Sequence, residues 1–143
     1  MFNNPSDEEI RRLLENTRRI AVVGLSPKPW RDSNAVARYL LERSYEVFPV
    51  YPTHEEILGQ KVYRSTAEIP GGVDLVDVFR RPEFLPAIVE DGLAARTKAF
   101  WFQLDCVSEE AALCASSQGK IVVMDRCIRV DHARLLGRKW PSR

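Results

Sequence analysis

Short apolar runs alternate along the chain with longer segments in which apolar residues recur every three or four positions. The first run, Ile20 to Val23, is mostly β-branched and ends at Gly24, so it predicts a buried strand. Residues 33–43 show helical spacing, and residues 46–50 predict a second strand. A strand, a helix and a strand in this order form a mononucleotide-binding βαβ unit. We therefore expect the fold to be organised around residues 20–52.

The same alternation continues to the end of the chain. Further strands are predicted over residues 61–63, 73–79, 98–103 and 121–124. Further helices are predicted over residues 7–16, 82–92, 108–119 and 131–136. Alternating strands and helices predict an α/β fold: a Rossmann-like, three-layer α/β/α arrangement around a mainly parallel sheet of five or six strands. The expected strand order is 3-2-1-4-5(-6), in one domain spanning residues 1–143 with its core at about residues 6–136.

Local signals add detail to these elements. Ser6 and Glu9 have the spacing of a capping box at the start of the first helix. Gly92 is predicted to cap the end of the helix that begins at Pro82. Residues 100–102 form an aromatic run, which we expect to lie in the sheet core and to alternate between the two helix layers. Cys114 falls on the apolar face of its predicted helix and is expected to be a small core residue.

Composition excludes several classes of function. The 21 Lys and Arg residues nearly balance the 20 Asp and Glu residues, without the basic stripe of a nucleic-acid-binding protein. No apolar run reaches membrane-spanning length and no signal peptide is evident, so we expect a cytoplasmic protein that does not bind membranes. The three cysteines contain no C-x-x-C pair, and the two histidines are not clustered. Neither a disulfide framework nor a metal site is predicted.

The first strand-to-helix turn lacks the features of a dinucleotide site. In open α/β sheets the ligand lies at the carboxyl ends of the strands, and NAD requires the glycine pattern G-x-G-x-x-G there. Only Gly24 is present, because Ser26 and Pro29 stand where the other glycines would fall. The acidic residue that binds the adenosine ribose is also missing from residues 50–52, at the end of the second strand. NAD is therefore disfavoured as the ligand.

The turn instead carries hydroxyl and cationic side chains around the start of a helix: Ser26, Lys28, Arg31 and Ser33. Free amides at a helix N-terminus attract anions, and these side chains extend that attraction to a more highly charged group. Trp30 is either an aromatic ligand contact or a lid over the core. Tyr51 adds a second aromatic ring, and Arg80 adds a cation from the other half of the sheet. A ligand with several phosphates and an adenine matches this set.

Five collinear motifs make the chain resemble the small, stand-alone CoA-binding proteins: residues 24–33, 50–52, 76–80, 101–104 and 123–127. The domain of that family is similar to the CoA-binding domain of the succinyl-CoA synthetase α-subunit. The resemblance spans residues 6–136 and implies that the chain binds coenzyme A or an acyl-CoA as its cofactor.

The resemblance also implies a set of binding residues. The turn from Gly24 to Arg31, together with Ser33, would hold the phosphates. Residues 50–52 would flank the adenine and the ribose, and Phe79, Arg80 and Gln103 would face the diphosphate and the pantetheine. The implied set is Gly24, Leu25, Ser26, Lys28, Trp30, Arg31, Ser33, Val50, Tyr51, Pro52, His54, Phe79, Arg80 and Gln103. His54 stands where the synthetase has a lysine, so weaker binding, or binding that strengthens on acidification, is expected.

No catalytic residues are predicted. The synthetase carries its phosphorylated histidine in a separate domain that this chain lacks, and His132, in the C-terminal tail, has no evident acidic partner. We expect a CoA-binding protein without catalysis of its own. The alternatives are an NAD(P)-dependent oxidoreductase, a CoA-dependent enzyme subunit that needs a partner chain, and a regulatory subunit that docks through surface such as the Trp140 tail. Small Rossmann-like domains often form homodimers, although no stretch here specifies such a contact.

Two cysteines lie at the predicted ends of strands. Cys106 follows one strand, and Cys127 follows the last strand beside Arg126, whose guanidinium would favour the thiolate. Each is a candidate to form a mixed disulfide with the thiol of CoA. The alternative for each is a buried, unreactive thiol.

Overall fold

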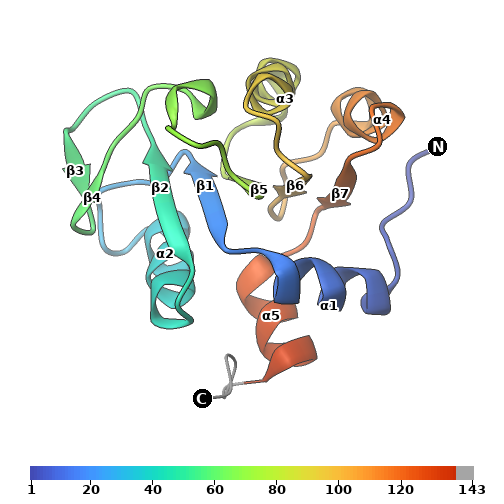
Figure 1. Cartoon of the computed structure of the whole chain (residues 1–143), viewed down its shortest axis with the longest axis horizontal. Helices are drawn as coiled ribbons and strands as arrows, with labels where there is room; N and C mark the ends of the chain where they lie inside the picture. Colours follow the sequence, from blue (N-terminus) through green and yellow to red (C-terminus); the bar gives the residue numbers. More distant parts are fainter. Residues whose placement is uncertain (138–143) are drawn as a thin grey trace.

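In the computed structural model, which describes residues 1–137, a five-stranded parallel sheet forms the centre of the molecule (Figure 1). Its strands, in order across the sheet, are β2 (Glu46–Val50), β1 (Arg19–Val23), β5 (Leu75–Val78), β6 (Ala99–Phe102) and β7 (Ile121–Met124). All neighbouring strands are parallel. The predicted Rossmann-like α/β fold is confirmed, and so is the predicted order of these five strands.

Helices cover both faces of the sheet, as the three-layer prediction requires (Figure 1). One face carries α1 (Asp7–Asn16), α2 (Asp32–Glu42) and α5 (Ile128–Leu136), and the other carries α3 (Leu85–Ala94) and α4 (Glu109–Ser117). Short 3-10 turns at Thr66–Glu68 and Pro82–Phe84 precede β5 and α3.

Each face of the sheet has its own hydrophobic core. Trp101 packs with the α1, α2 and α5 layer, whereas Phe100 and Phe102 pack with the α3 and α4 layer. All three aromatic side chains are completely buried. The predicted alternation along this run is therefore confirmed.

The predicted strand at residues 61–63 is reduced to a single bridge. Residues 56–61 form a separate antiparallel hairpin of β3 (Glu56–Ile57) and β4 (Gln60–Lys61), and only Tyr63 pairs with the edge strand β2. The Tyr63 N–H donates to the Pro49 carbonyl at 2.9 Å, and its carbonyl accepts from the Tyr51 N–H at 3.0 Å. Pro49 has no N–H to offer the residues before Tyr63, so this pairing ends there.

The local signals have mixed outcomes. The capping box at Ser6 and Glu9 is present. Gly92 does not end its helix, because α3 continues to Ala94, and a Cβ at Gly92 would lie 2.4 Å from the Phe100 ring. The prediction of a C-cap was wrong: this glycine makes room for a core aromatic. Cys114 is exposed on α4, so its predicted core role was also wrong.

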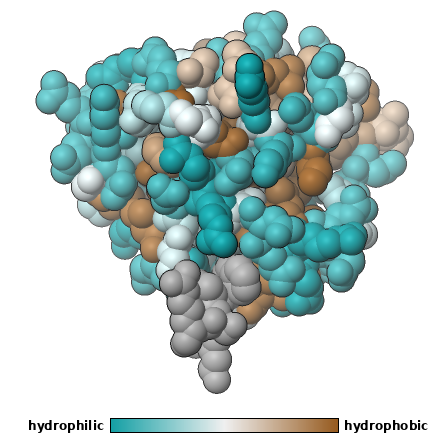
Figure 2. All heavy atoms as spheres, in the orientation of Figure 1, coloured by the Kyte–Doolittle hydropathy of each residue, from teal (hydrophilic) through white to brown (hydrophobic). Residues whose placement is uncertain are grey.

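Hydrophilic side chains cover most of the face shown in Figure 2, with smaller apolar areas between them. Within residues 1–137, no helix combines the length and apolar character that crossing a membrane requires. In the same described part of the chain, no three His, Cys, Asp or Glu residues gather as they would around a metal ion. The Trp140 tail lies outside the described residues.

Candidate functional site

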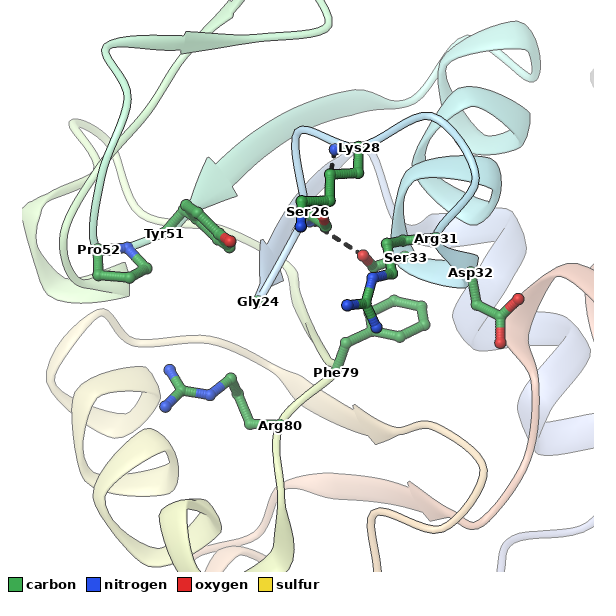
Figure 3. Close-up of a pocket in the computed structure, with 10 residues that line it drawn as sticks. All are labelled: Gly24, Ser26, Lys28, Arg31, Asp32, Ser33, Tyr51, Pro52, Phe79 and Arg80. Carbon is green, nitrogen blue, oxygen red and sulfur yellow. Dashed lines mark hydrogen bonds between the residues drawn. The ribbon is translucent and has the colours of Figure 1, made fainter.

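A cleft of about 480 Å³ opens where the carboxyl ends of β1, β2 and β5 meet the start of α2 (Figure 3). Its lining residues come from the loop after β1, from the end of β2 and from the end of β5: Gly24, Ser26, Lys28, Arg31, Asp32, Ser33, Tyr51, Pro52, Phe79 and Arg80. The volume lies within the range of small-molecule sites, about 300–1,000 Å³. Nine of these ten residues belong to the predicted binding set; Asp32 is the addition.

Backbone hydrogen bonds hold the three segments together. The Gly24 N–H donates to the Val50 carbonyl at 2.9 Å, and the Phe79 N–H donates to the Val23 carbonyl at 2.9 Å. Gly24 has a φ of +85°, which glycine adopts without strain. The carboxyl ends of β1, β2 and β5 are thus held side by side at the cleft.

Polar side chains from α2 shape the loop after β1. The Ser26 N–H donates to Ser33 Oγ at 3.0 Å, and Asn34 Nδ2 donates to the Ser26 carbonyl at 2.9 Å. The Lys28 N–H donates to Ser26 Oγ at 3.1 Å, which closes a tight turn. Sequence reasoning missed Asn34. A small polar pair at a helix start, here Ser33 and Asn34, was the available signal.

Of the residues that the structure describes, three cations line the cleft: Lys28, Arg31 and Arg80. Within residues 1–137 none of them forms an ion pair. Arg31 is also the N-cap residue of α2 and supplies no side-chain cap, so the first amides of the helix remain available to a ligand. In Figure 3 the Asp32 carboxylate points away from Arg80. The cleft therefore has the charge and the donors of an anion site.

Five residues of the predicted set do not line this cleft. Leu25 is completely buried in the core, and Val50 is buried with its carbonyl bonded to Gly24. Trp30 is 75% exposed, so it is not a lid over the core. His54 is exposed, with Nδ1 2.9 Å from Thr53 Oγ1. Gln103 is buried and lines a neighbouring cavity instead.

That neighbouring cavity, of about 350 Å³, lies between α2 and α5 and shares Asp32 and Phe79 with the cleft. It is lined by Asp32, Ala35, Val36, Phe79, Gln103, Leu104, Cys127, Arg129 and Val130. Leu104 and Val130 are each 60% exposed. An elongated ligand in the cleft therefore has a continuation past Phe79 with mostly apolar walls.

A buried carboxyl group stands behind this second cavity. Gln103 Nε2 donates to Asp77 in the centre of β5, and Gln103 Oε1 accepts from the Ile128 N–H at the start of α5 at 3.4 Å. Asp77 is completely buried. Burial raises the pKa of Asp77 to about 7, and the hydrogen bond from Gln103 opposes this rise. The signal in the sequence is an acidic residue inside an otherwise apolar strand.

His132 lies in the core between α5 and α2 and not in an exposed tail. Its Nδ1 is 2.9 Å from the Tyr39 hydroxyl, and its ring meets the edges of Tyr39 and Tyr45. Burial, with the charge of Arg43, lowers its pKa to about 4. His132 lines neither the cleft nor the second cavity.

The three cysteines have different surroundings. Cys127 is half-buried and lines the second cavity. Cys106 is buried, and burial raises the pKa of its thiol. The Arg126 guanidinium was expected to favour the Cys127 thiolate. It instead forms a two-pronged pair with the Asp131 carboxylate, at 2.8 and 2.9 Å.

A family model described as a CoA binding domain matches residues 18–133. The chain belongs to this CoA-binding domain family. The resemblance inferred from the five motifs is thereby confirmed. The family match spans every segment that lines the cleft and the second cavity.

The chain is similar to short proteins over nearly their full length and also to a small part of a longer ligase subunit. The uncharacterised protein YneT of Bacillus subtilis is 45% identical over 132 residues, which is 92% of this chain and 98% of YneT. A hypothetical protein from Pyrococcus horikoshii, known as a solved structure, is 41% identical with a TM-score of 0.91, covering 96% of this chain and 99% of that one. The α-subunit of the ADP-forming acetate–CoA ligase I of Pyrococcus furiosus is 35% identical over 85 residues, 54% of this chain but only 18% of the subunit.

Proposed function

We propose that the protein binds coenzyme A or an acyl-CoA in the cleft at the carboxyl ends of β1, β2 and β5. The observation that supports this most directly is that Lys28, Arg31 and Arg80 line the cleft beside the open start of α2 and, within residues 1–137, form no ion pairs. Membership of the CoA-binding domain family narrows the class of anion to CoA. A phosphate-rich nucleotide neutralises this charge and satisfies the free amides of the helix.

Each wall of the cleft suits one part of CoA. The diphosphate lies against the loop after β1, where Lys28, Arg31 and the first amides of α2 converge. The adenine and its ribose lie against Tyr51 and Pro52 at the end of β2. The pantetheine arm passes Phe79 into the second cavity, whose mostly apolar walls suit an alkyl amide chain.

The protein acts by holding CoA, without catalysis of its own, in the cytoplasm. The identity to YneT, over nearly the full length of both chains, supports a role carried by the CoA-binding domain itself. A second candidate function is that of a CoA-presenting subunit that works with a partner chain. Leu104 and Val130, which line the second cavity and are largely exposed, favour it, as does the partial match to a ligase α-subunit.

Thermal unfolding in the presence of CoA, acetyl-CoA, NAD and NADP tests the proposal. A ligand that binds only the folded protein raises the midpoint in proportion to the logarithm of its concentration above Kd. We expect CoA or acetyl-CoA to raise the midpoint and the two dinucleotides to leave it unchanged. A larger effect of NAD or NADP would overturn the proposal. Adding a candidate ligase partner chain and acyl substrates to the CoA-loaded protein tests the second candidate.

A further inference from the structure

A third cavity, of about 130 Å³, adjoins the cleft on the far side of Tyr51 and Pro52. It shares these two residues and Arg80 with the cleft, so the two spaces are neighbours. Its other polar lining residues are Arg64, Thr66 and Asp91. None of these three belongs to the predicted binding set, so the function described above leaves this cavity unexplained.

Arg64 is anchored at the rim of the cavity. Its Nη1 donates to the carbonyl of Tyr51 at 3.0 Å and to that of Thr53 at 3.2 Å. These bonds tie the guanidinium to the turn that follows β2. A guanidinium has five N–H donors, so most of its donors stay available for an anion. In the described part of the chain Arg64 has no ion pair.

Arg80 brings a second guanidinium to the same cavity from the end of β5. Its Cζ lies 4.3 Å above the Phe84 ring, which holds the side chain in place. Figure 3 shows Arg80 extending toward the Pro52 side of the cleft, away from Arg31. Both arginines therefore line the third cavity, whereas Lys28 and Arg31 line only the cleft beside the loop after β1.

Asp91, on α3, places one carboxylate in the same cavity. It lies beyond ion-pair distance of either arginine. Burial raises the pKa of Asp91, with contributions from Glu90 and Glu68. The cavity thus offers two guanidiniums for an anion and, beside them, an oxygen acceptor that suits a hydroxyl group.

We propose that the third cavity binds the 3′-phosphate of the CoA ribose, with Arg64 as the residue that selects CoA over dephospho-CoA. A volume of about 130 Å³ is enough for a single phosphate group between the two arginines. A ribose 3′-phosphate carries a hydroxyl on the neighbouring carbon, which matches an acceptor beside two cations. The inference rests on the proposed function, because the ribose must already lie against Tyr51 and Pro52.

Isothermal titration calorimetry with CoA and dephospho-CoA tests this selectivity. Arg64→Gln removes the charge but keeps an amide that can donate to the Tyr51 carbonyl. We expect the wild-type protein to bind CoA about tenfold more tightly than dephospho-CoA. Arg64→Gln should weaken the affinity for CoA about tenfold and change the affinity for dephospho-CoA by less than about twofold. Arg96→Gln is the matched control, because Arg96 is exposed after α3 and lines none of the three spaces. It should leave both affinities unchanged.

The outcomes separate this inference from the proposed function. Equal wild-type affinity for CoA and dephospho-CoA, or an equal loss of both in Arg64→Gln, overturns the role of Arg64 and leaves CoA binding in place. Absence of binding by either nucleotide overturns both proposals. A titration with inorganic phosphate distinguishes the ribose phosphate from a free anion. Phosphate that binds as tightly as CoA, and weakens in Arg64→Gln, would contradict a site built for the nucleotide.

Discussion

The backbone of Gly24 lies directly against the carbonyl oxygen of Phe79. A Cβ on Gly24 would stand 2.3 Å from that oxygen, closer than side-chain carbons approach backbone atoms. The contact joins the turn after β1 to the end of β5, and both segments line the cleft. Glycine is required here by the packing of the protein backbone, whether or not a ligand is bound.

Gly24→Ala should destabilise the fold by at least about 2 kcal/mol, because it adds a steric clash with backbone to a positive φ. Gly59→Ala is the matched control: Gly59 also has a positive φ, +74°, but a Cβ there meets nothing within 4 Å. Urea unfolding of the two variants isolates the clash from the backbone strain. Equal losses of stability would show that the Phe79 contact relaxes freely.

Arg31→Ala should weaken CoA binding by about tenfold, because it removes a charged donor from the open start of α2. It should also reduce the dependence of Kd on salt concentration, since fewer charges then attract the phosphates. Calorimetry at several salt concentrations measures both effects. Arg11→Ala, an exposed substitution on α1, is the control and should change neither. Unaltered affinity in Arg31→Ala would contradict the phosphate assignment.

The parts of the fold that could be predicted depend on local patterns. Four apolar residues before Gly24 indicate a buried strand, and Ser6 with Glu9 indicates a helix start, wherever the rest of the chain lies. The strand order follows from the alternation of strands and helices with right-handed crossovers. The cations of the cleft were predictable because the carboxyl ends of parallel strands meet at one edge of the sheet.

The parts that could not be predicted depend on contacts between distant segments. His132 stands beside Asp131 in a segment of mixed polar and apolar residues, and only the packing of α5 on its neighbours buries the ring against Tyr39 and Tyr45. In the sequence, Gly92 has the position of a helix C-cap. Only the fold shows that the Phe100 ring occupies the space that a side chain at this position would need. Arg64 has no sequence motif, because its position depends on the turn that follows β2.

His132 should make the fold less stable as the pH falls. Its pKa is about 4 in the folded protein against 6.5 when unfolded, so the unfolded chain binds more protons between these values. Stability from this residue rises between pH 4 and 6.5, by up to about 3 kcal/mol in total. The free energy of unfolding of His132→Phe, measured by urea unfolding at several pH values, should not show this rise. His54→Asn, which alters an exposed histidine, should retain it.

Asp77 should make the fold less stable as the pH rises, which is opposite to the effect of His132. Its pKa is about 7 in the folded protein against 3.8, so the folded state binds more protons between these values. Its contribution is greatest at low pH and is lost as the pH rises toward 7. The two buried groups therefore offset each other in the wild-type protein, and Asp77→Asn should make stability rise more steeply with pH. A wild-type profile that Asp77→Asn leaves unchanged would show that this carboxyl is not protonated on folding.

Cys127 should form a mixed disulfide with CoA when the protein meets CoA disulfide. The Cys127 thiolate attacks one sulfur of the disulfide, a bond forms between Cys127 Sγ and that sulfur, and the other CoA leaves as its thiolate. We expect this at Cys127 because it lines the cavity assigned to the pantetheine arm, whereas Cys106 is buried and Cys114 is exposed on α4, away from both spaces. Intact-mass spectrometry should show one adduct that dithiothreitol removes, which Cys127→Ser abolishes and Cys114→Ser does not.

Arg31→Ala should slow the reaction with CoA disulfide but not with a small neutral disulfide, because only the former depends on the phosphate site. Equal rates for the two reagents in the wild-type protein, or labelling that follows Cys114, would mean that the thiol end of CoA does not reach the second cavity.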